Sequence, residues 1–354
     1  MQTIRSNRAN FEFVMGVQNG SPLRVKFENH RASLSDEAAK LLIGCRTDDF
    51  YTVVYDKPPS KGDSILFTRN GGVGDILLTT PLIRELHKLG AEIDYVTDYP
   101  DILLGNPNIR KVYKTGQDLP DGSSYQFIVD VNQYTENADL HGNKDHRAIV
   151  FGKAIDLTLD KSQIKLDYYI TKKEAQAGKK TVDAVKKQTG CDKVIVFVWD
   201  AHCPQRIWSD NRRYNTIKAL SEKNYATIVL CRDLVEIPSD IKGVINLSTK
   251  ADLRKCGSLI SACDCVLTPD TGLMHLAAAL DVPTVAYMGQ FPPEERCTHD
   301  KLIVLNEPST CSIFPCHQYR CMNRGTENIP RCIDLAIHKV INAVDKIIEC
   351  NIQN

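Results

Sequence analysis

The segment RNGGVGDILLTTP, residues 69–81, places three glycines before a single aspartate, Asp75. A glycine-rich turn at a helix N-terminus can bind a phosphate or bring a substrate close to the backbone. The Lys-Ser/Thr pair of a nucleoside-triphosphate loop is absent. Gly72 and Gly74 have the G-x-G spacing of a dinucleotide fingerprint, but the third glycine is missing and Asp75 would face the pyrophosphate. Asp75 is therefore either a helix cap or a general base.

A second segment, LTPDTGLMHLAAAL at residues 267–280, places polar groups at the start of another expected helix. Thr271 and Gly272 offer a hydroxyl and free N–H groups that suit a diphosphate. His275 lies one turn further on and faces the same way as Thr271. The alternatives are that Asp270 or Thr271 only caps the helix, and that His275 is a packed core residue.

A third segment, VWDAHCPQRIW at residues 198–208, ends in a basic residue two positions before a tryptophan. Arg206 can neutralise a leaving diphosphate through charge-assisted hydrogen bonds. We assign Arg206 and Trp208 to a donor-binding site. Arg212 and Arg213, on the following expected helix, are interpreted as solvated surface residues.

The elements that must position these residues alternate between apolar, β-branched runs and helical segments. This pattern predicts α/β architecture with two doubly wound parallel sheets. Pro81 is expected to begin a second helical segment after one short turn. Strands are expected at residues 64–68, 92–97, 125–131, 194–199, 226–230, 265–268 and 283–288, and helices at 75–89, after 209, at 251–263, from 271 and at 333–350.

We divide the chain into three parts: a small α+β module at residues 1–60, a first Rossmann-like domain at 61–178, and a second at 179–354. The second carries a cysteine-rich tail and a final helix that packs back on the body. The module is expected to contain a hairpin around Asn19-Gly20, a helix at 33–44 and a third strand at 50–55.

Composition bounds the class of protein. The 354 residues contain 44 basic and 44 acidic side chains, so a highly basic nucleic-acid or membrane binder is disfavoured. The sequence has no run of about 20 apolar residues that could span a bilayer and no apolar secretory signal at its start. An odd number of cysteines, thirteen, favours reduced thiols. We expect a cytoplasmic protein, and peripheral contact with the inner membrane face stays open.

Together the three segments resemble glycosyltransferase family nine, the heptosyltransferase-type enzymes, over residues 62–348. The motifs are GDILLTTP, RIW and DTGLMHLAAALDVPTVAYMG. The resemblance implies the GT-B architecture, in which two Rossmann-like domains face a cleft. It implies inverting, metal-independent transfer of a sugar from a nucleotide-diphosphate donor, with ADP-heptose as the family default. The acceptor would be a glycan or another hydroxyl-bearing substrate. Residues 1–60, for which we place no counterpart in the family, are a candidate site for a partner.

The resemblance also implies roles for single residues. Asp75 would deprotonate the acceptor hydroxyl, and the glycines before it would let the acceptor approach. Arg206 would contact the donor phosphates where the family usually has lysine, a change that alters phosphate geometry. The remaining donor-site residues would be Asp270 at the sugar or nucleoside, Thr271 and Gly272 at the diphosphate, and His275 supporting their loop.

Four cysteines crowd near the end of the chain, in CSIFPCHQYRCMNRGTENIPRC. They are Cys311, Cys316, Cys321 and Cys332. Four thiolates could hold a structural zinc ion, although their spacing meets the usual C-x2–4-C pattern only loosely. Reduced thiols in a packed loop are the alternative, and no cofactor is expected for catalysis itself.

Rival functions remain open from the sequence alone. They are a catalytically idle nucleotide-sugar-binding or adaptor module on the same fold, a nucleotide-sugar epimerase, and an NAD oxidoreductase. The nucleotide, the donor sugar, the acceptor and the oligomeric state are not determined by the sequence.

Overall fold

The computed structural model describes most of the chain. The described residues are 2–6, 11–18, 21–28, 31–34, 51–54, 57–117, 119–132, 145–316 and 320–352. They divide into two compact units. The first consists of residues 1–71, 79–100 and 107–164, and the second of residues 72–78, 101–106 and 165–354.

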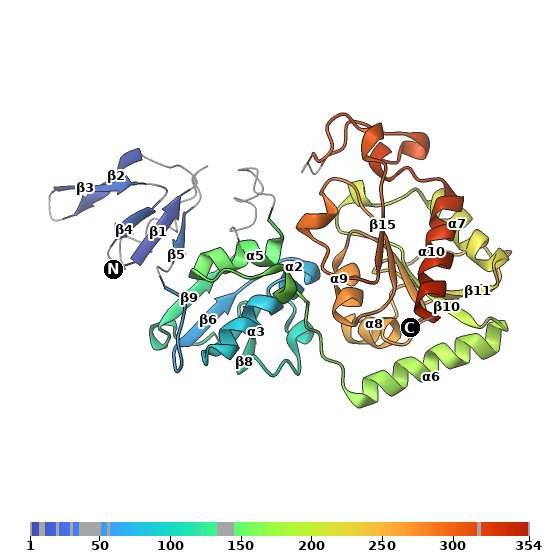
Figure 1. The fold of residues 1–354 in the computed structure, drawn as a ribbon, viewed down its shortest axis with the longest axis horizontal. Coiled ribbons are helices and arrows are strands. Elements are labelled where there is room, and N and C mark those ends of the chain that lie inside the picture. The colour runs from blue at the N-terminus through green and yellow to red at the C-terminus, as the bar shows by residue number, and fades with distance from the viewer. Residues whose placement is uncertain are drawn as a thin grey trace. The chain divides into compact units, whose positions relative to one another are not determined.

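The N-terminal strands of the first unit pair antiparallel (Figure 1). β2 (Phe11–Gln18) and β3 (Ser21–Phe27) form the hairpin expected around Asn19-Gly20. β1 (Gln2–Ser6) lies between β4 (Arg31–Leu34) and β5 (Tyr51–Val54), so the expected third strand is also confirmed. The helix expected at residues 33–44 falls largely outside the described residues.

The main sheet of the first unit has four parallel strands in the order β8-β7-β6-β9. β6 (Ser64–Thr68) and β7 (Glu92–Thr97) coincide with the expected strands because both are buried, largely apolar runs. Two further strands complete the sheet, β8 (Lys111–Lys114) and β9 (Phe127–Asp130). α5 (Arg147–Gly152) contacts α3 (Thr80–Lys88) in the same unit.

The helix expected at residues 75–89 is two helices. α2 (Val73–Leu77) ends before Thr79, and α3 begins at Thr80 with Pro81 in its first turn. Proline fits there because its missing N–H would have no helical partner in the first turn. The expected second segment at Pro81 is therefore confirmed, and the short α2 groups with the second unit whereas α3 groups with the first.

The second unit contains six parallel strands in the order β12-β11-β10-β13-β14-β15. β10 is the first strand of this sheet along the chain, so the order is the 3-2-1-4-5-6 of a doubly wound nucleotide-binding fold. The strands are β10 (Lys193–Val198), β11 (Tyr225–Leu230), β12 (Val244–Asn246), β13 (Cys265–Pro269), β14 (Thr284–Tyr287) and β15 (Leu302–Leu305).

Helices cover both faces of this sheet. α6 (Lys172–Thr189), α8 (Leu253–Ile260) and α9 (Gly272–Ala279) pack side by side in one layer. α7 (Asp210–Glu222) and α10 (Ile337–Ile352) contact each other and form the other layer. α10 is the expected final helix, and it packs on β13, β14 and β15. None of the described helices is long and apolar enough to cross a membrane.

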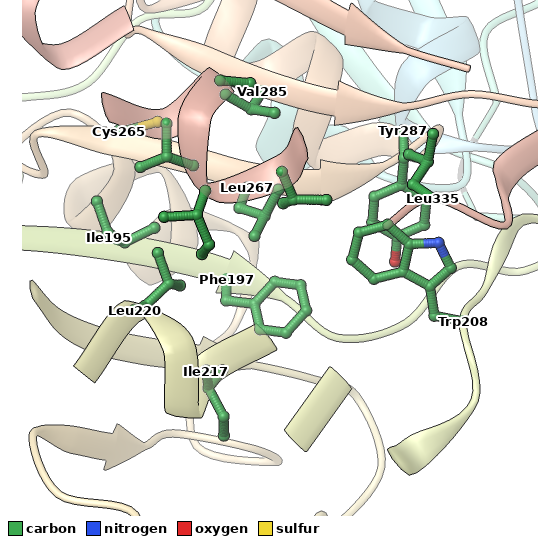
Figure 2. Close-up of a cluster of buried hydrophobic side chains, with 14 of the residues drawn as sticks. Ile195, Phe197, Trp208, Ile217, Leu220, Cys265, Leu267, Val285, Tyr287 and Leu335 are labelled. Atoms are coloured by element: carbon green, nitrogen blue, oxygen red, sulfur yellow. The ribbon is translucent and has the colours of Figure 1, made fainter. Parts of the chain in front are cut away.

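The core between this sheet and α7 and α10 is continuous and apolar (Figure 2). Phe197 and Leu267 from the strands are fully buried against Ile217 and Leu220 of α7. Burial of this kind is worth about 1.5–3 kcal/mol for each large side chain. This core fixes the strand ends from which the candidate site residues follow.

The unit boundary differs from the expected one at residues 178 and 179. The change of unit falls between Ile164 and Lys165, so the whole of α6 belongs to the second unit. The physical reason lies at Gly178, because a Cβ added there would overlap the Ser258 carbonyl of α8. The lysine-rich helix interpreted as a join is thus a closely packed element of one unit.

Candidate active site

The second sheet reverses its strand order between β10 and β13. Ligands of open α/β sheets bind outside the carboxyl ends of the strands at such a switch point. The loop that carries Arg206 follows β10, and Asp270 and Thr271 follow β13. The fold therefore brings the second and third sequence motifs to the same end of the same sheet.

Arg206 and Asp270 meet in this unit. Arg206 Nη1 lies 3.4 Å from Asp270 Oδ2 and donates to the Asp270 carbonyl at 3.3 Å. Asp270 is almost fully buried, whereas 16% of the Arg206 side chain is exposed. Within the part of the chain that the structure describes, Arg206 Nη2 has no hydrogen-bond acceptor. The arginine therefore keeps donor capacity for a ligand.

Thr271 stands at the N-cap of α9 but does not cap it. Its backbone is extended, and its side chain makes no cap hydrogen bond. Because the capping interpretation required that bond, the Thr271 hydroxyl stays available at a helix N-terminus that favours anions. The α9 N-terminus thus has the chemistry for a diphosphate, although the role itself stays a prediction.

The first motif packs on the third inside the second unit, where α2 lies against α9. A Cβ added to Gly74 would lie within 3.0 Å of the His275 ring, and one added to Gly272 would come equally close to Val73. His275 is buried beneath α2. Gly74 and Gly272 are therefore required for close helix contact. His275 packs at this contact, and its role in supporting the diphosphate loop stays a prediction.

Asp75 is half-buried in the first turn of the short helix α2. A Cβ on Gly72 would lie only 3.3 Å from Asp75 Oδ2, so the glycine lets the carboxylate come close to the backbone of the N-cap. Gly72 itself is the N-cap and makes no side-chain cap. The carboxylate lies one residue from Gly74, which contacts α9, so α2 places the candidate base beside the candidate diphosphate loop.

Trp208 does not have the position that a donor-binding residue requires. The sequence suggested a donor-binding residue, but Trp208 is 2% exposed and stacks on Tyr287 with ring centroids 3.7 Å apart (Figure 2). Its indole N–H donates to the Ile333 carbonyl at 2.7 Å. Both its ring and its polar atom are therefore occupied by the protein, and Trp208 anchors the loop that carries Arg206.

Arg212 and Arg213 also differ from expectation, because neither is a solvated surface residue. Arg212 pairs with Asp334 at 2.9 Å. Arg213 donates to the Trp199 carbonyl at 2.6 Å and lies over the Trp199 ring. The apolar stems and planar heads of arginines allow such burial, which a charge pattern alone does not reveal.

Two residues that contact Arg206 were not predicted from the sequence. Gln290 Oε1 accepts from Arg206 Nε at 3.1 Å, and the Phe291 ring lies 5.4 Å from the Arg206 guanidinium carbon. Arg296 covers the same ring at 3.6 Å. The one available signal was position, because Gly289-Gln290 directly follows the carboxyl end of β14 and Met288.

The four cysteines are partly brought together. Burial raises the pKa of Cys332, and the nearby thiols of Cys311, Cys321 and Cys316 add to this effect. Among the described residues, which omit His317, no group of three or more histidine, cysteine or acidic side chains is arranged to hold a metal ion. The zinc site therefore stays a prediction.

Comparison with known proteins identifies the family. The model of glycosyltransferase family 9, the heptosyltransferases, matches residues 108–324, which is more than half of the chain. The chain belongs to this family. It is 27% identical over 177 residues to lipooligosaccharide heptosyltransferase 2 of Haemophilus influenzae, covering 44% of this chain and 51% of that protein. The chain thus spans about half the length of this curated relative.

Solved structures agree on the fold. The family 9 glycosyltransferase of Veillonella parvula has a TM-score of 0.59 at 16% identity, covering 82% of this chain and 98% of that chain. The ADP-heptose heptosyltransferase II of E. coli has a TM-score of 0.56 at 17% identity, covering 81% and 99%. The iron-containing dodecameric glycosyltransferase TibC of E. coli has a TM-score of 0.59 at 12% identity, covering 98% and 91%. The chain therefore has the GT-B-like fold of these enzymes.

Proposed function

We propose that this chain transfers a heptose-type sugar from ADP-heptose to an acceptor hydroxyl, with inversion and without a catalytic metal. The observation that carries the proposal is the position of Arg206, Asp270 and Thr271 together at the switch point of the second sheet. ADP-heptose is favoured because the family is that of the heptosyltransferases and a structurally similar E. coli enzyme is an ADP-heptose heptosyltransferase.

The donor chemistry follows from the charged and polar groups of the site. A diphosphate leaving group develops negative charge as the sugar bond breaks, and fixed donors stabilise such charge. Arg206 supplies guanidinium N–H groups, and Thr271 supplies a hydroxyl at the α9 N-terminus. Asp270, held beside Arg206, is the candidate acceptor for a sugar or nucleoside hydroxyl.

Asp75 is the candidate general base for the acceptor hydroxyl. Its carboxylate lies on α2, and α2 contacts the first turn of α9 through Val73 and Gly74. The base and the diphosphate loop are therefore held by one contact within the second unit. Gly72 bears no side chain beside Asp75, which suits the approach of an acceptor.

The donor is tested by a thermal-shift screen of the purified chain against ADP-heptose and against GDP-, UDP- and CDP-sugars. The proposal expects the largest stabilisation with ADP-heptose, because ligands that bind only the folded state raise the unfolding temperature. A second reaction with labelled ADP-heptose then offers glycan, protein and nucleic-acid acceptors. Consumption of donor without any acceptor, leaving an isomer, would instead identify an epimerase. A flat screen would contradict the proposal.

The base is tested by Asp75→Asn. We expect turnover to fall by about 100-fold or more, the usual contribution of a general base, because the amide cannot take the proton. ADP affinity should stay within about twofold, since Asp75 acts on the acceptor side. Asp98→Asn is the matched control, because Asp98 follows the neighbouring strand β7 and, among the described residues, binds only the Gly71 N–H. Retained turnover in Asp75→Asn would contradict the proposal that Asp75 is the general base.

The cysteine cluster is a separate proposal, of a structural metal held by Cys311, Cys316, Cys321 and Cys332. TibC is described as iron-containing, and our sequence analysis suggested zinc. Elemental analysis of the purified chain separates zinc, iron and neither. Absence of a stoichiometric metal from protein purified without chelator would leave the cysteines as packed thiols.

A further inference from the structure

Gln290 has an unusual backbone for a buried polar residue. It is 3% exposed, and its φ is +71°, in the left-handed region that favours glycine. The chain offers a glycine at position 289, yet the left-handed conformation falls on the glutamine. Residues held in such strained conformations cluster at ligand sites, where the surrounding structure enforces them.

The side chain of Gln290 is oriented by Arg206. A guanidinium has only donors, so the atom that faces Arg206 Nε at 3.1 Å must be the amide oxygen. The amide nitrogen then points away from Arg206, and it is buried without an acceptor among the described residues. An unpaired buried donor destabilises the fold. Gln290 therefore has a strained backbone and a buried amide nitrogen without an acceptor among the described residues. Its amide oxygen makes one hydrogen bond, to Arg206, the residue expected to bind the diphosphate of the sugar donor.

The backbone beside Gln290 packs against the cysteine segment, residues 311–332. Cys332 Sγ fills the space that a Cβ on Gly289 would need. The Gln290 backbone also hydrogen-bonds to the Cys332 thiol, which opposes the rise in its pKa that burial causes. The turn at Gly289 and Gln290 therefore packs against Cys332 through its backbone. The side chain of Gln290 hydrogen-bonds to Arg206.

We propose that Gln290 is a positioning residue that directs the Arg206 guanidinium toward the diphosphate of the donor. Its amide oxygen fixes Nε, which leaves the Nη2 end of Arg206 for phosphate oxygens. This inference rests on the proposed function, because it assumes a nucleoside-diphosphate ligand. Gln290 would then determine how much more tightly the site binds a nucleoside diphosphate than the nucleoside alone.

The test is isothermal titration of ADP and of adenosine into the full chain and into Gln290→Met. Methionine keeps the length of the side chain and removes its hydrogen bonds. We expect ADP affinity to fall about tenfold, as for a lost hydrogen bond to a charged group, while adenosine affinity stays unchanged. A purely structural role would weaken both ligands equally, so equal losses or an ADP affinity within twofold would overturn the inference.

Two further variants make the outcome decisive. Gln290→Asn keeps an amide and tolerates the left-handed backbone, but it is one methylene too short for Arg206, so it should show the same selective loss of ADP. Asn224→Met is the matched control, because Asn224 is another amide residue with positive φ, 59°, in this unit. It should leave both affinities unchanged. If Gln290→Met and Gln290→Asn both fail to fold, the residue is structural and the inference fails. If the unchanged chain does not bind ADP, the proposed function fails first and this inference with it.

Discussion

Arg206 and Arg254 lie in the same unit, and each pairs with a carboxylate, but the two pairs differ in kind. Arg254 binds both oxygens of Glu174, at 2.8 and 2.6 Å, and its third nitrogen donates to the Asp101 carbonyl. Arg206 approaches Asp270 only at 3.4 Å and leaves Nη2 without an acceptor among the described residues. An arginine whose three nitrogens all donate to the protein holds structure, whereas one with a nitrogen to spare can hold a ligand.

The surroundings of the two arginines show the same contrast. Near Arg254, the α6–α8 contact is so close that Gly178 meets the Ser258 carbonyl and Gly257 meets the Tyr168 ring. Near Arg206, the structure tolerates a strained backbone at Gln290 and an amide nitrogen that has no acceptor among the described residues. An unfavourable backbone conformation and a buried nitrogen that lacks an acceptor in the described part of the chain are thus found beside the candidate site, whereas the contact between α6 and α8 is closely packed. Such exceptions to local folding preferences are expected at functional sites.

The largest effect on stability is expected from Gly178→Ala. A Cβ there would overlap the Ser258 backbone, so α6 must move from α8. Overpacking of this kind costs about 1–3 kcal/mol, and thermal unfolding followed by circular dichroism measures it. Gln176→Ala, at an exposed position of the same helix, is the control and should change stability by less than about 0.5 kcal/mol. Equal unfolding temperatures for Gly178→Ala and the unchanged chain would contradict the described contact.

A smaller effect is expected from Glu174→Gln. Hydrogen bonds from Arg254 lower the pKa of Glu174 to about 2, against the effect of burial. Because the folded pKa lies below the unfolded value, the stabilisation is present above about pH 4.5 and is lost as the pH falls toward 2. A quarter of the side chain is exposed, so solvent screening limits the effect to about 1 kcal/mol.

Glutamine keeps the capping box with Thr171, so this variant isolates the charge of Glu174. The unfolding free energies of the two proteins, measured from pH 7 to pH 2, should differ most above pH 5 and converge toward pH 2. A difference that is constant with pH would show that the ion pair contributes nothing.

Much of the fold was predictable because its strands are short, buried and β-branched. β6 and β7 were found with their observed bounds, and Pro81 marked the start of α3 correctly. β1, β4, β8, β12 and β15 were missed. For β8, β12 and β15 the reason is that strands of three or four residues without buried side chains carry almost no periodic signal. The assignment of α2 to the second unit was also missed, because it depends on contacts far apart in the sequence.

The site was predictable as a set of motifs but not in its detail. Arg206 and Asp270 do meet, yet the pattern could not show that Trp208 stacks inside the core on Tyr287. Nor could it show that Gln290, rather than Gly289, takes the left-handed backbone. Both depend on the packing of the cysteine segment against the strand ends, which no local pattern records.

The central claim is that Arg206, and not Arg254, binds the donor diphosphate. The most direct measurement is isothermal titration of ADP into the unchanged chain, Arg206→Met and Arg254→Met, with the unfolding temperature of each recorded. We expect ADP affinity to fall at least about tenfold in Arg206→Met, as for lost charged hydrogen bonds. Arg254→Met should keep its affinity within about twofold and unfold at a lower temperature. Unchanged affinity in Arg206→Met, or a loss confined to Arg254→Met, would contradict the account.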